Sequence, residues 1–206
     1  LTSGAGNTAI GYQAMLEHTD GSYNTVLGWG AMVNTNSGEA SNTVIGYQAA
    51  ASMDDAGCDE NVIIGSAAGT GGEAAMASCV VIGASAMNST ANNAQTGTIA
   101  IGKSALVALT SGAGNTAIGY QAATQHTTGD RNIAIGYQAM YQTAGDVNYA
   151  PNSDDNIFIG HTAGGGNWAD AATSSQNVGI GNNALAGVLN AANGNTSVGH
   201  GSLAAL

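Results

Sequence analysis

The chain has 206 residues, of which only 7% are charged, and its 13 acidic residues outnumber the two basic ones to give a formal charge of −11. This charge would repel a phosphate backbone, which excludes nucleic acid as a partner. No apolar run reaches the roughly 18 residues that cross a bilayer, so we expect no membrane insertion.

A short motif, close to Asn-Thr-Ala-Ile-Gly-Tyr-Gln-Ala, recurs along the whole chain, and residues 1–14 are repeated without change at 109–122. Successive motif glycines are 17 to 24 residues apart. We therefore predict a single repeat domain, residues 1–206, made of eleven units. In chain order the motif glycines are Gly11, Gly28, Gly46, Gly65, Gly83, Gly102, Gly119, Gly136, Gly160, Gly181 and Gly199.

Each motif predicts a strand of four or five residues that ends directly before its glycine, because β-branched residues favour extended backbone. The last strand residue is always aliphatic, and we assign this row to the core inside the coil. The row consists of Ile10, Leu27, Ile45, Ile64, Ile82, Ile101, Ile118, Ile135, Ile159, Ile180 and Val198. The residue before it points the opposite way, and we expect that smaller face to pack against sister chains.

Units of this length have no room for a crossover helix. Stacking them predicts an all-β fold, a parallel β-solenoid with about eleven coils. The motif glycines are expected at its corners, where a positive φ or a close approach excludes a Cβ. An Asn four residues before most of these glycines predicts a ladder of stacked amides.

The motif, with its variable Gly/Ser/Thr-rich spacer, resembles the head repeats of trimeric autotransporter adhesins and, more closely, repeats of bacteriophage tail fibres. The resemblance covers essentially the whole chain, and the units here are longer than adhesin head repeats, which favours the phage fibre. It implies a left-handed β-roll, a homotrimer, and attachment to a host surface through a glycan or protein receptor. The expected location is a virion tail fibre. The alternative is a bacterial extracellular filament or surface adhesin whose subunits assemble end to end.

Aromatic residues follow several motif glycines and are candidate ligand contacts. A flat ring beside an amide suits saccharide binding, whereas stacking of the rings between successive units would only support the register. The candidates are Tyr12, Trp29, Tyr47, Tyr120, Tyr137 and, in a long spacer, Trp168. We also expect receptor contacts in the long spacers around 149–155 and 168–176.

The remaining polar residues favour no catalytic or metal site. Acidic pairs at 54–55, 59–60 and 154–155 do not have the spacing of a calcium loop, so we interpret them as solvated turns. The four histidines lie in separate units, and no nucleophile with a matching base is recognisable, so we expect neither enzymatic activity nor a cofactor. A disulfide between Cys58 and Cys79 is left open. An ice-binding face is disfavoured, because the strand threonines are sporadic and are assigned inward.

Overall fold

The computed structural model describes residues 3–35, 38–71, 75–89, 94–141, 153–166, 168, 173–187, 189 and 191–204. Within these residues every regular element is a β-strand, so the predicted all-β class is confirmed. The strands are β1 (Thr8–Ile10), β2 (Thr25–Leu27), β3 (Thr43–Ile45), β4 (Val62–Ile64), β5 (Met76–Ala77), β6 (Val80–Ile82), β7 (Gln95–Thr96), β8 (Ile99–Ile101), β9 (Thr116–Ile118), β10 (Ile133–Ile135), β11 (Ile157–Ile159), β12 (Val178–Ile180) and β13 (Thr196–Val198).

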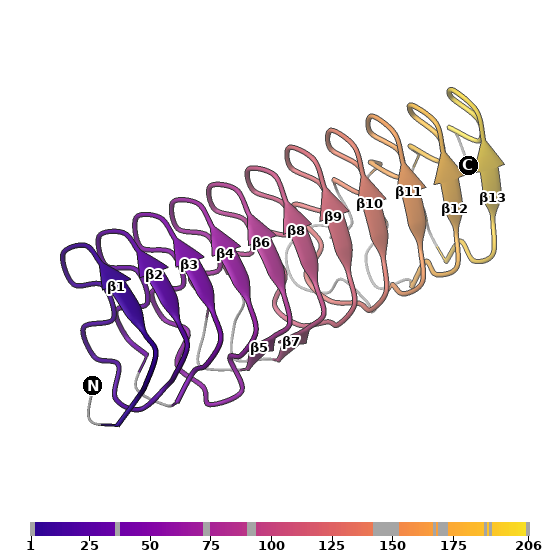
Figure 1. Cartoon of the computed structure of the whole chain (residues 1–206). Coiled ribbons are helices and arrows are strands. Elements are labelled where there is room, and N and C mark those ends of the chain that lie inside the picture. Colours follow the sequence, from indigo (N-terminus) through magenta and orange to yellow (C-terminus); the bar gives the residue numbers. More distant parts are fainter. Residues whose placement is uncertain are drawn as a thin grey trace.

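The motif strands form one 11-stranded parallel sheet in the order β1-β2-β3-β4-β6-β8-β9-β10-β11-β12-β13. Neighbouring strands pair in register, so that Ile10 lies beside Leu27 and Leu27 beside Ile45. Between strands the chain turns back and returns to the same side, which confirms the predicted parallel β-solenoid (Figure 1). β5 and β7 form a second, two-stranded parallel sheet.

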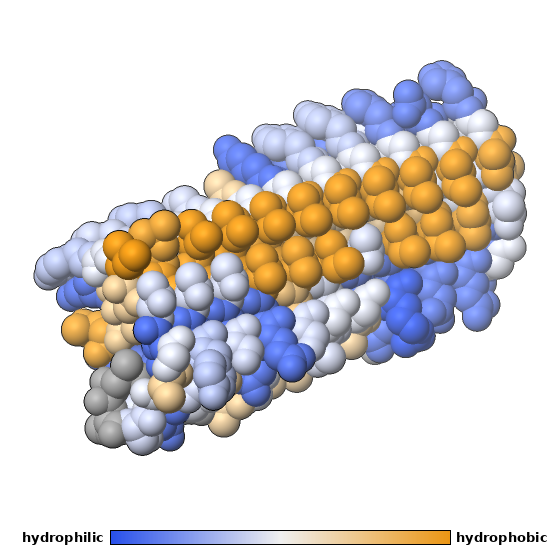
Figure 2. Space-filling view, viewed as in Figure 1, coloured by the Kyte–Doolittle hydropathy of each residue, from blue (hydrophilic) through white to orange (hydrophobic). Residues whose placement is uncertain are grey.

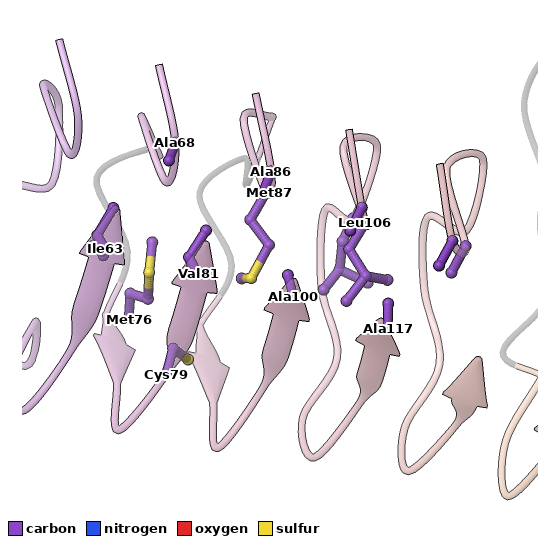
Figure 3. Close-up of a cluster of buried hydrophobic side chains, with 14 of the residues drawn as sticks. Ile63, Ala68, Met76, Cys79, Val81, Ala86, Met87, Ala100, Leu106 and Ala117 are labelled. Atoms are coloured by element: carbon purple, nitrogen blue, oxygen red, sulfur yellow. The ribbon is translucent and has the colours of Figure 1, made fainter. Parts of the chain in front are cut away.

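The interior of the solenoid is narrow and is filled mainly by small side chains. The central residue of every motif strand except β1 is buried, as in Val26, Val81 and Ala100. These residues pack against an alanine three positions after the motif glycine, present in every unit but the last, and in several coils against the Met or Leu that follows it (Figure 3). The alanines with full burial are Ala31, Ala49, Ala68, Ala86, Ala105, Ala122, Ala139, Ala163 and Ala184.

The structure reverses the expected orientation of the strands. The row that we assigned to the core points outward: Ile10 is 58% exposed and Val198 is 68% exposed, and the members between them are half-buried or exposed. The corrected residues are Ile10, Leu27, Ile45, Ile64, Ile82, Ile101, Ile118, Ile135, Ile159, Ile180 and Val198. The Asn ladder explains this orientation. The Asn four residues before the motif glycine points inward, and side chains alternate between the two faces of a strand. The central strand residue, two positions after the Asn, therefore also points inward, and the residue directly before the glycine points outward.

The predicted amide ladder is present along the inner edge of the sheet. The Asn42 side-chain oxygen accepts hydrogen bonds from the backbone N–H of Asn61 at 3.0 Å and from its side-chain amide at 3.0 Å. The same Asn61 amide also donates to the carbonyl oxygen of Met76 at 2.6 Å. Equivalent bonds join Asn7, Asn24, Asn42 and Asn61, and then Asn115, Asn132, Asn156, Asn177 and Asn195. Each buried amide is therefore satisfied by its neighbour and by a backbone carbonyl.

The ladder is interrupted between Asn61 and Asn115, where Cys79 and Thr98 occupy the Asn position. The Cys79 backbone N–H still donates to the Asn61 side-chain oxygen at 2.9 Å. The Thr98 hydroxyl is buried, and among the described residues it has no hydrogen-bond partner. The adjoining pair β5–β7 adds backbone hydrogen bonds in the same region.

The motif glycines all have a φ that is unfavourable for other residues, from +125° at Gly199 to +150° at Gly28. A Cβ on any of them except Gly199 would lie 2.1 to 2.6 Å from the backbone of the next motif glycine. Any other residue would thus push neighbouring coils apart.

The ring of Phe158, the one phenylalanine of the chain, fits inside the coil because glycines lie beside it. Phe158 pairs in register with Gly179, and Gly164 also faces the ring, since a Cβ at Gly164 would lie 2.5 Å from it. The Phe158 ring meets Trp168 edge-on, with centroids 5.8 Å apart. Trp168 is 2% exposed and donates its indole N–H to the Gly164 carbonyl at 3.1 Å. Our interpretation of Trp168 as a ligand contact is therefore wrong, because the ring fills the interior.

Candidate interaction surface

The most distinctive surface of the molecule is the outward side of the motif sheet, which we call the outer aliphatic face. It has two rows, located three residues and one residue before each motif glycine. The second row is the Ile/Leu/Val series given above. The first row consists of Thr8, Thr25, Thr43, Val62, Val80, Ile99, Thr116, Ile133, Ile157, Val178 and Thr196. These threonines point outward rather than inward as we expected, but they form no continuous array.

Neither row contains a charged or amide side chain. Figure 2 shows the Ile/Leu/Val row as a hydrophobic band along the length of the rod, and the other row as hydrophobic where it holds Val or Ile and neutral where it holds Thr. Ten spacings separate the first and last strands of the 11-stranded sheet, so the band is about 48 Å long. The width of the band is the length of a three-residue strand, about 10 Å. The two rows thus cover about 500 Å², apolar except for the five threonines of the first row, and a patch of this size is often functional.

Two rows border the outer aliphatic face at opposite ends of its strands, and all their residues except the half-buried Ala84 are exposed. The aromatic flank comprises the residues directly after the motif glycines: Tyr12, Trp29, Tyr47, Ser66, Ala84, Lys103, Tyr120, Tyr137, His161, Asn182 and His200. The polar flank comprises the residues five positions before those glycines: Gly6, Tyr23, Ser41, Glu60, Ser78, Gly97, Gly114, Arg131, Asp155, Gln176 and Gly194. Every polar-flank residue is exposed, and each has a φ between +54° and +72°.

The aromatic candidates stack on one another along the aromatic flank. Trp29 lies between Tyr12 and Tyr47, with centroid distances of 5.9 and 5.1 Å and interplanar angles of 22° and 12°. In this arrangement both faces of Trp29 are covered, whereas Tyr12 and Tyr47 each stack on Trp29 with one face. Ring stacking between successive units, the alternative to saccharide binding, is thus the geometry found, and a sugar contact stays a prediction.

The second stack consists of Tyr120, Tyr137 and His161. Tyr137 lies 5.3 Å from Tyr120 and 5.1 Å from His161, and its ring is within 6° of parallel to the His161 ring. His161 was not among the aromatic candidates predicted from the sequence, because that prediction considered only Tyr and Trp. Beside the stack, the side-chain amide of Gln138 donates a hydrogen bond to the side-chain oxygen of Gln121 at 2.8 Å. This bond also joins two successive coils in register.

The polar flank carries the one bidentate ion pair among the described residues. The Arg131 guanidinium donates from Nε and Nη2 to the two carboxylate oxygens of Asp155 at 2.6 and 3.0 Å. The contact holds the pKa of the Asp155 carboxyl below its usual value and raises the pKa of Arg131. Both side chains are exposed, so the pair orders the flank more than it stabilises the fold.

Two of the histidines are buried inside the coil at equivalent positions, seven residues after a motif glycine. His18 Nδ1 lies 3.5 Å from the Glu39 carboxylate, and both side chains are fully buried. Burial lowers the pKa of His126 to about 4, although the Gly129 carbonyl and the carboxylates of Asp154 and Asp130 act in the opposite direction. Both rings contribute to the interior rather than to a surface site.

The two cysteines are buried and form no disulfide within the described chain. The Cys58 sulfur accepts a hydrogen bond from the backbone N–H of Met76 at 3.3 Å, and Cys79 donates to the carbonyl of Ala77 at 3.3 Å. Burial raises the pKa of the Cys58 thiol to about 11 and also raises that of Cys79. Both thiols are therefore poor nucleophiles.

The acidic pairs take part in the turns before the strands. Asp59 accepts a hydrogen bond from the backbone N–H of Ala40 at 2.7 Å, and Asp154 accepts one from that of Asp130 at 2.8 Å. Asp55 accepts from Gly57 at 2.8 Å. Across the described ranges no group of three potential metal ligands is found. Asp59 and Asp154 thus join successive coils through the backbone, whereas Asp55 closes its own turn.

Two further predictions concern the long spacers and the membrane. The spacers around 149–155 and 168–176 lie partly outside the described residues, since 142–152, 167 and 169–172 are not described. The part of the chain that the structure describes contains no helix capable of spanning a bilayer.

Comparison of the chain with family models, curated proteins and solved structures found no significant match.

Proposed function

We propose that the chain is a structural and adhesive module of an extracellular fibre, of the kind found in phage tail fibres, and that it works as a homotrimer with left-handed coils. The observation that supports this is the outer aliphatic face, which leaves an uncharged band of about 500 Å² along a rod of stacked coils. Covering this band with copies of the same chain removes it from water. The stacked coils then supply a stiff spacer, since each coil is bonded to the next through backbone and amide ladders.

A pair of single variants tests the assembly. Ile101→Glu places a charge in the middle of the outer aliphatic face, where the half-buried side chain points outward. Leu16→Glu places the same charge on a residue that is 56% exposed and lies outside that face. We expect Ile101→Glu to yield monomers with unchanged strand content by circular dichroism, while Leu16→Glu keeps the mass of the unmodified chain. Equal masses for both variants would contradict the proposal.

Receptor contact belongs to the same proposal and concerns the aromatic flank. Its ring edges and the phenol groups of Tyr12 and Tyr47 are exposed and repeat along the rod, so a glycan or protein on a host surface would meet the same groups several times. Tyr12→Phe with Tyr47→Phe keeps the stacks and removes the hydroxyls. If attachment to host cells is unchanged in this variant, the receptor lies elsewhere.

A second candidate is a bacterial filament or surface adhesin that assembles end to end. In the described structure β1 pairs with β2 alone and β13 with β12 alone, so each has an edge open to a further strand. Electron microscopy of purified protein distinguishes the two assemblies. Discrete rods favour the fibre module, and continuous filaments favour end-to-end growth.

A further inference from the structure

The rings of the aromatic flank are interrupted in the middle of the rod, beyond the ends of β4, β6 and β8 (Figure 1). Tyr47 ends the first stack and Tyr120 begins the second, and the coils between them carry Ser66, Ala84 and Lys103 at the same position. Backbone hydrogen bonds of 2.9 to 3.0 Å join each coil to the next beside the stretch from Tyr47 to Lys103, which we call the ring gap. The ring gap spans three strand spacings, about 14 Å.

Tyr47 presents one face of its ring to the ring gap. The other face stacks on Trp29, with centroids 5.1 Å apart and an interplanar angle of 12°. One coil later the same position holds Ser66, whose side chain is too small to cover a phenol ring. Tyr47 is accordingly 51% exposed, against 42% for Trp29, which has a ring on either side. An open aromatic face of this kind suits the apolar C–H face of a sugar ring.

Gln48, the next residue along the chain, adds a polar group beside the open ring. The same row holds Gly30 and Ala67 in the two neighbouring coils, and neither has a polar side chain with which the amide could pair. In the second stack the equivalent amides do pair, since Gln138 donates to Gln121 at 2.8 Å. The Gln48 amide therefore keeps both a donor and an acceptor for the hydroxyl groups of a ligand.

Lys103 lies at the other end of the ring gap and is one of two basic residues in a chain with 13 acidic ones. The other, Arg131, is held by the carboxylate of Asp155. Lys103 is exposed, and within the described ranges its ammonium group forms no ion pair. The aromatic flank itself contains no acidic residue. An anionic group at the ring gap thus meets a local positive charge on a molecule that is negative as a whole.

We propose that the ring gap binds a short acidic oligosaccharide, with one sugar ring on the open face of Tyr47, its hydroxyls bonded to Gln48, and a carboxylate at Lys103. The inference rests on the receptor contact proposed above and gives it a place and a chemical class. The carboxylate is part of the proposal because charge-assisted hydrogen bonds are the stronger ones, and a neutral sugar would leave the ammonium group without one.

An acidic peptide fits the same charge less well. An extended peptide binds most readily by adding a strand to a free sheet edge. The coils of the ring gap offer no such edge, because β4, β6 and β8 are each paired on both sides. What the ring gap presents instead is an aromatic face, an amide and a hydroxyl, which match the C–H face and the hydroxyl groups of a sugar.

Isothermal titration calorimetry of the unmodified chain tests the ligand class. The acidic probes are trigalacturonate and a trimer of sialic acid, and the comparison ligands are the methyl ester of trigalacturonate and triglutamate. We expect saturable binding of at least one acidic trisaccharide, and binding about tenfold or more weaker for the ester and for the peptide. Binding of neither acidic trisaccharide, or equal binding of the ester or the peptide, would overturn the proposal.

Three variants locate the site. Ser66→Tyr continues the first stack over the open face of Tyr47, so we expect thermal stability to be kept or raised while binding falls about tenfold or more. The control His200→Tyr adds the same ring to the flank outside the ring gap and should leave binding unchanged. Lys103→Gln should weaken binding of the acidic trisaccharide about tenfold and not that of its ester. Full binding by Ser66→Tyr or by Lys103→Gln would overturn the site.

The mass of the unmodified chain, measured by light scattering in the same samples, separates the site from the assembly. A trimer that binds neither acidic trisaccharide would overturn the ring gap as a site and leave the proposed structural module standing. A monomer that binds one of them would support the site and overturn the assembly.

Discussion

Replacement of a single motif glycine by alanine probes how closely the coils are stacked. In Gly83→Ala the new Cβ would lie 2.5 Å from both the carbonyl carbon and the oxygen of Gly102, and the φ of +136° is strained for alanine. Relief requires the neighbouring coil to move by about 1 Å. That movement weakens the backbone hydrogen bonds of 2.7 Å from Gly102 to Ile82 and 3.0 Å from Ser104 to Ala84.

The expected loss follows from these two effects. A strained backbone costs about 1–3 kcal/mol, and two weakened hydrogen bonds cost about 1 kcal/mol each. Gly83→Ala should therefore lower the free energy of unfolding by about 3–5 kcal/mol, measured by urea denaturation at fixed protein concentration.

Two matched variants separate the effects. Gly97 has a φ of +61° with nothing within 4 Å of an added Cβ, and Gly199 has a φ of +125° with equally open space. Gly97→Ala should cost about 1–2 kcal/mol, and Gly199→Ala should cost only the strain of about 1–3 kcal/mol. A Gly83→Ala variant as stable as Gly97→Ala would refute the close stacking of motif glycines.

Three other perturbations address the interior. Thr98→Asn extends the amide ladder at a buried hydroxyl that has no partner among the described residues, so thermal unfolding should show a gain of about 1 kcal/mol, and a loss would contradict the ladder. Phe158→Ala should cost about 3–5 kcal/mol in urea, and a cost below about 1 kcal/mol would mean that the ring is not enclosed. Because burial holds the pKa of His126 at about 4 in place of 6.5, the unfolded chain binds the extra proton between these values. Stability should therefore be complete above pH 6.5 and fall by about 3 kcal/mol as the pH is lowered to 4. His126→Leu should remove this share of the pH dependence, and an unchanged profile would show that His126 is not its source.

Much of the fold follows from the repeat. Parallel stacking could be predicted because units of 17 to 24 residues each repeat one strand and leave no room for a helix layer. The amide ladder could be predicted because Asn recurs in register four residues before most motif glycines. Both depend only on spacing, which the sequence displays directly.

Strand orientation could not be obtained from hydrophobicity, because both faces of the motif strand are apolar. In β4, Val62, Ile63 and Ile64 are equally plausible core residues, and only Ile63 is buried. The deciding signal is the polar residue Asn61, whose amide requires the inward face. Trp168 was misassigned for a related reason. Its position in a long spacer gives no sign that its ring packs edge-on against Phe158 inside the coil.

Sedimentation equilibrium of the unmodified chain tests the central claim that the outer aliphatic face is covered by further copies of the protein. The account predicts a species three times the chain mass of 20.1 kDa that persists on dilution. A single species at the chain mass, with the outward isoleucines in water, would contradict it.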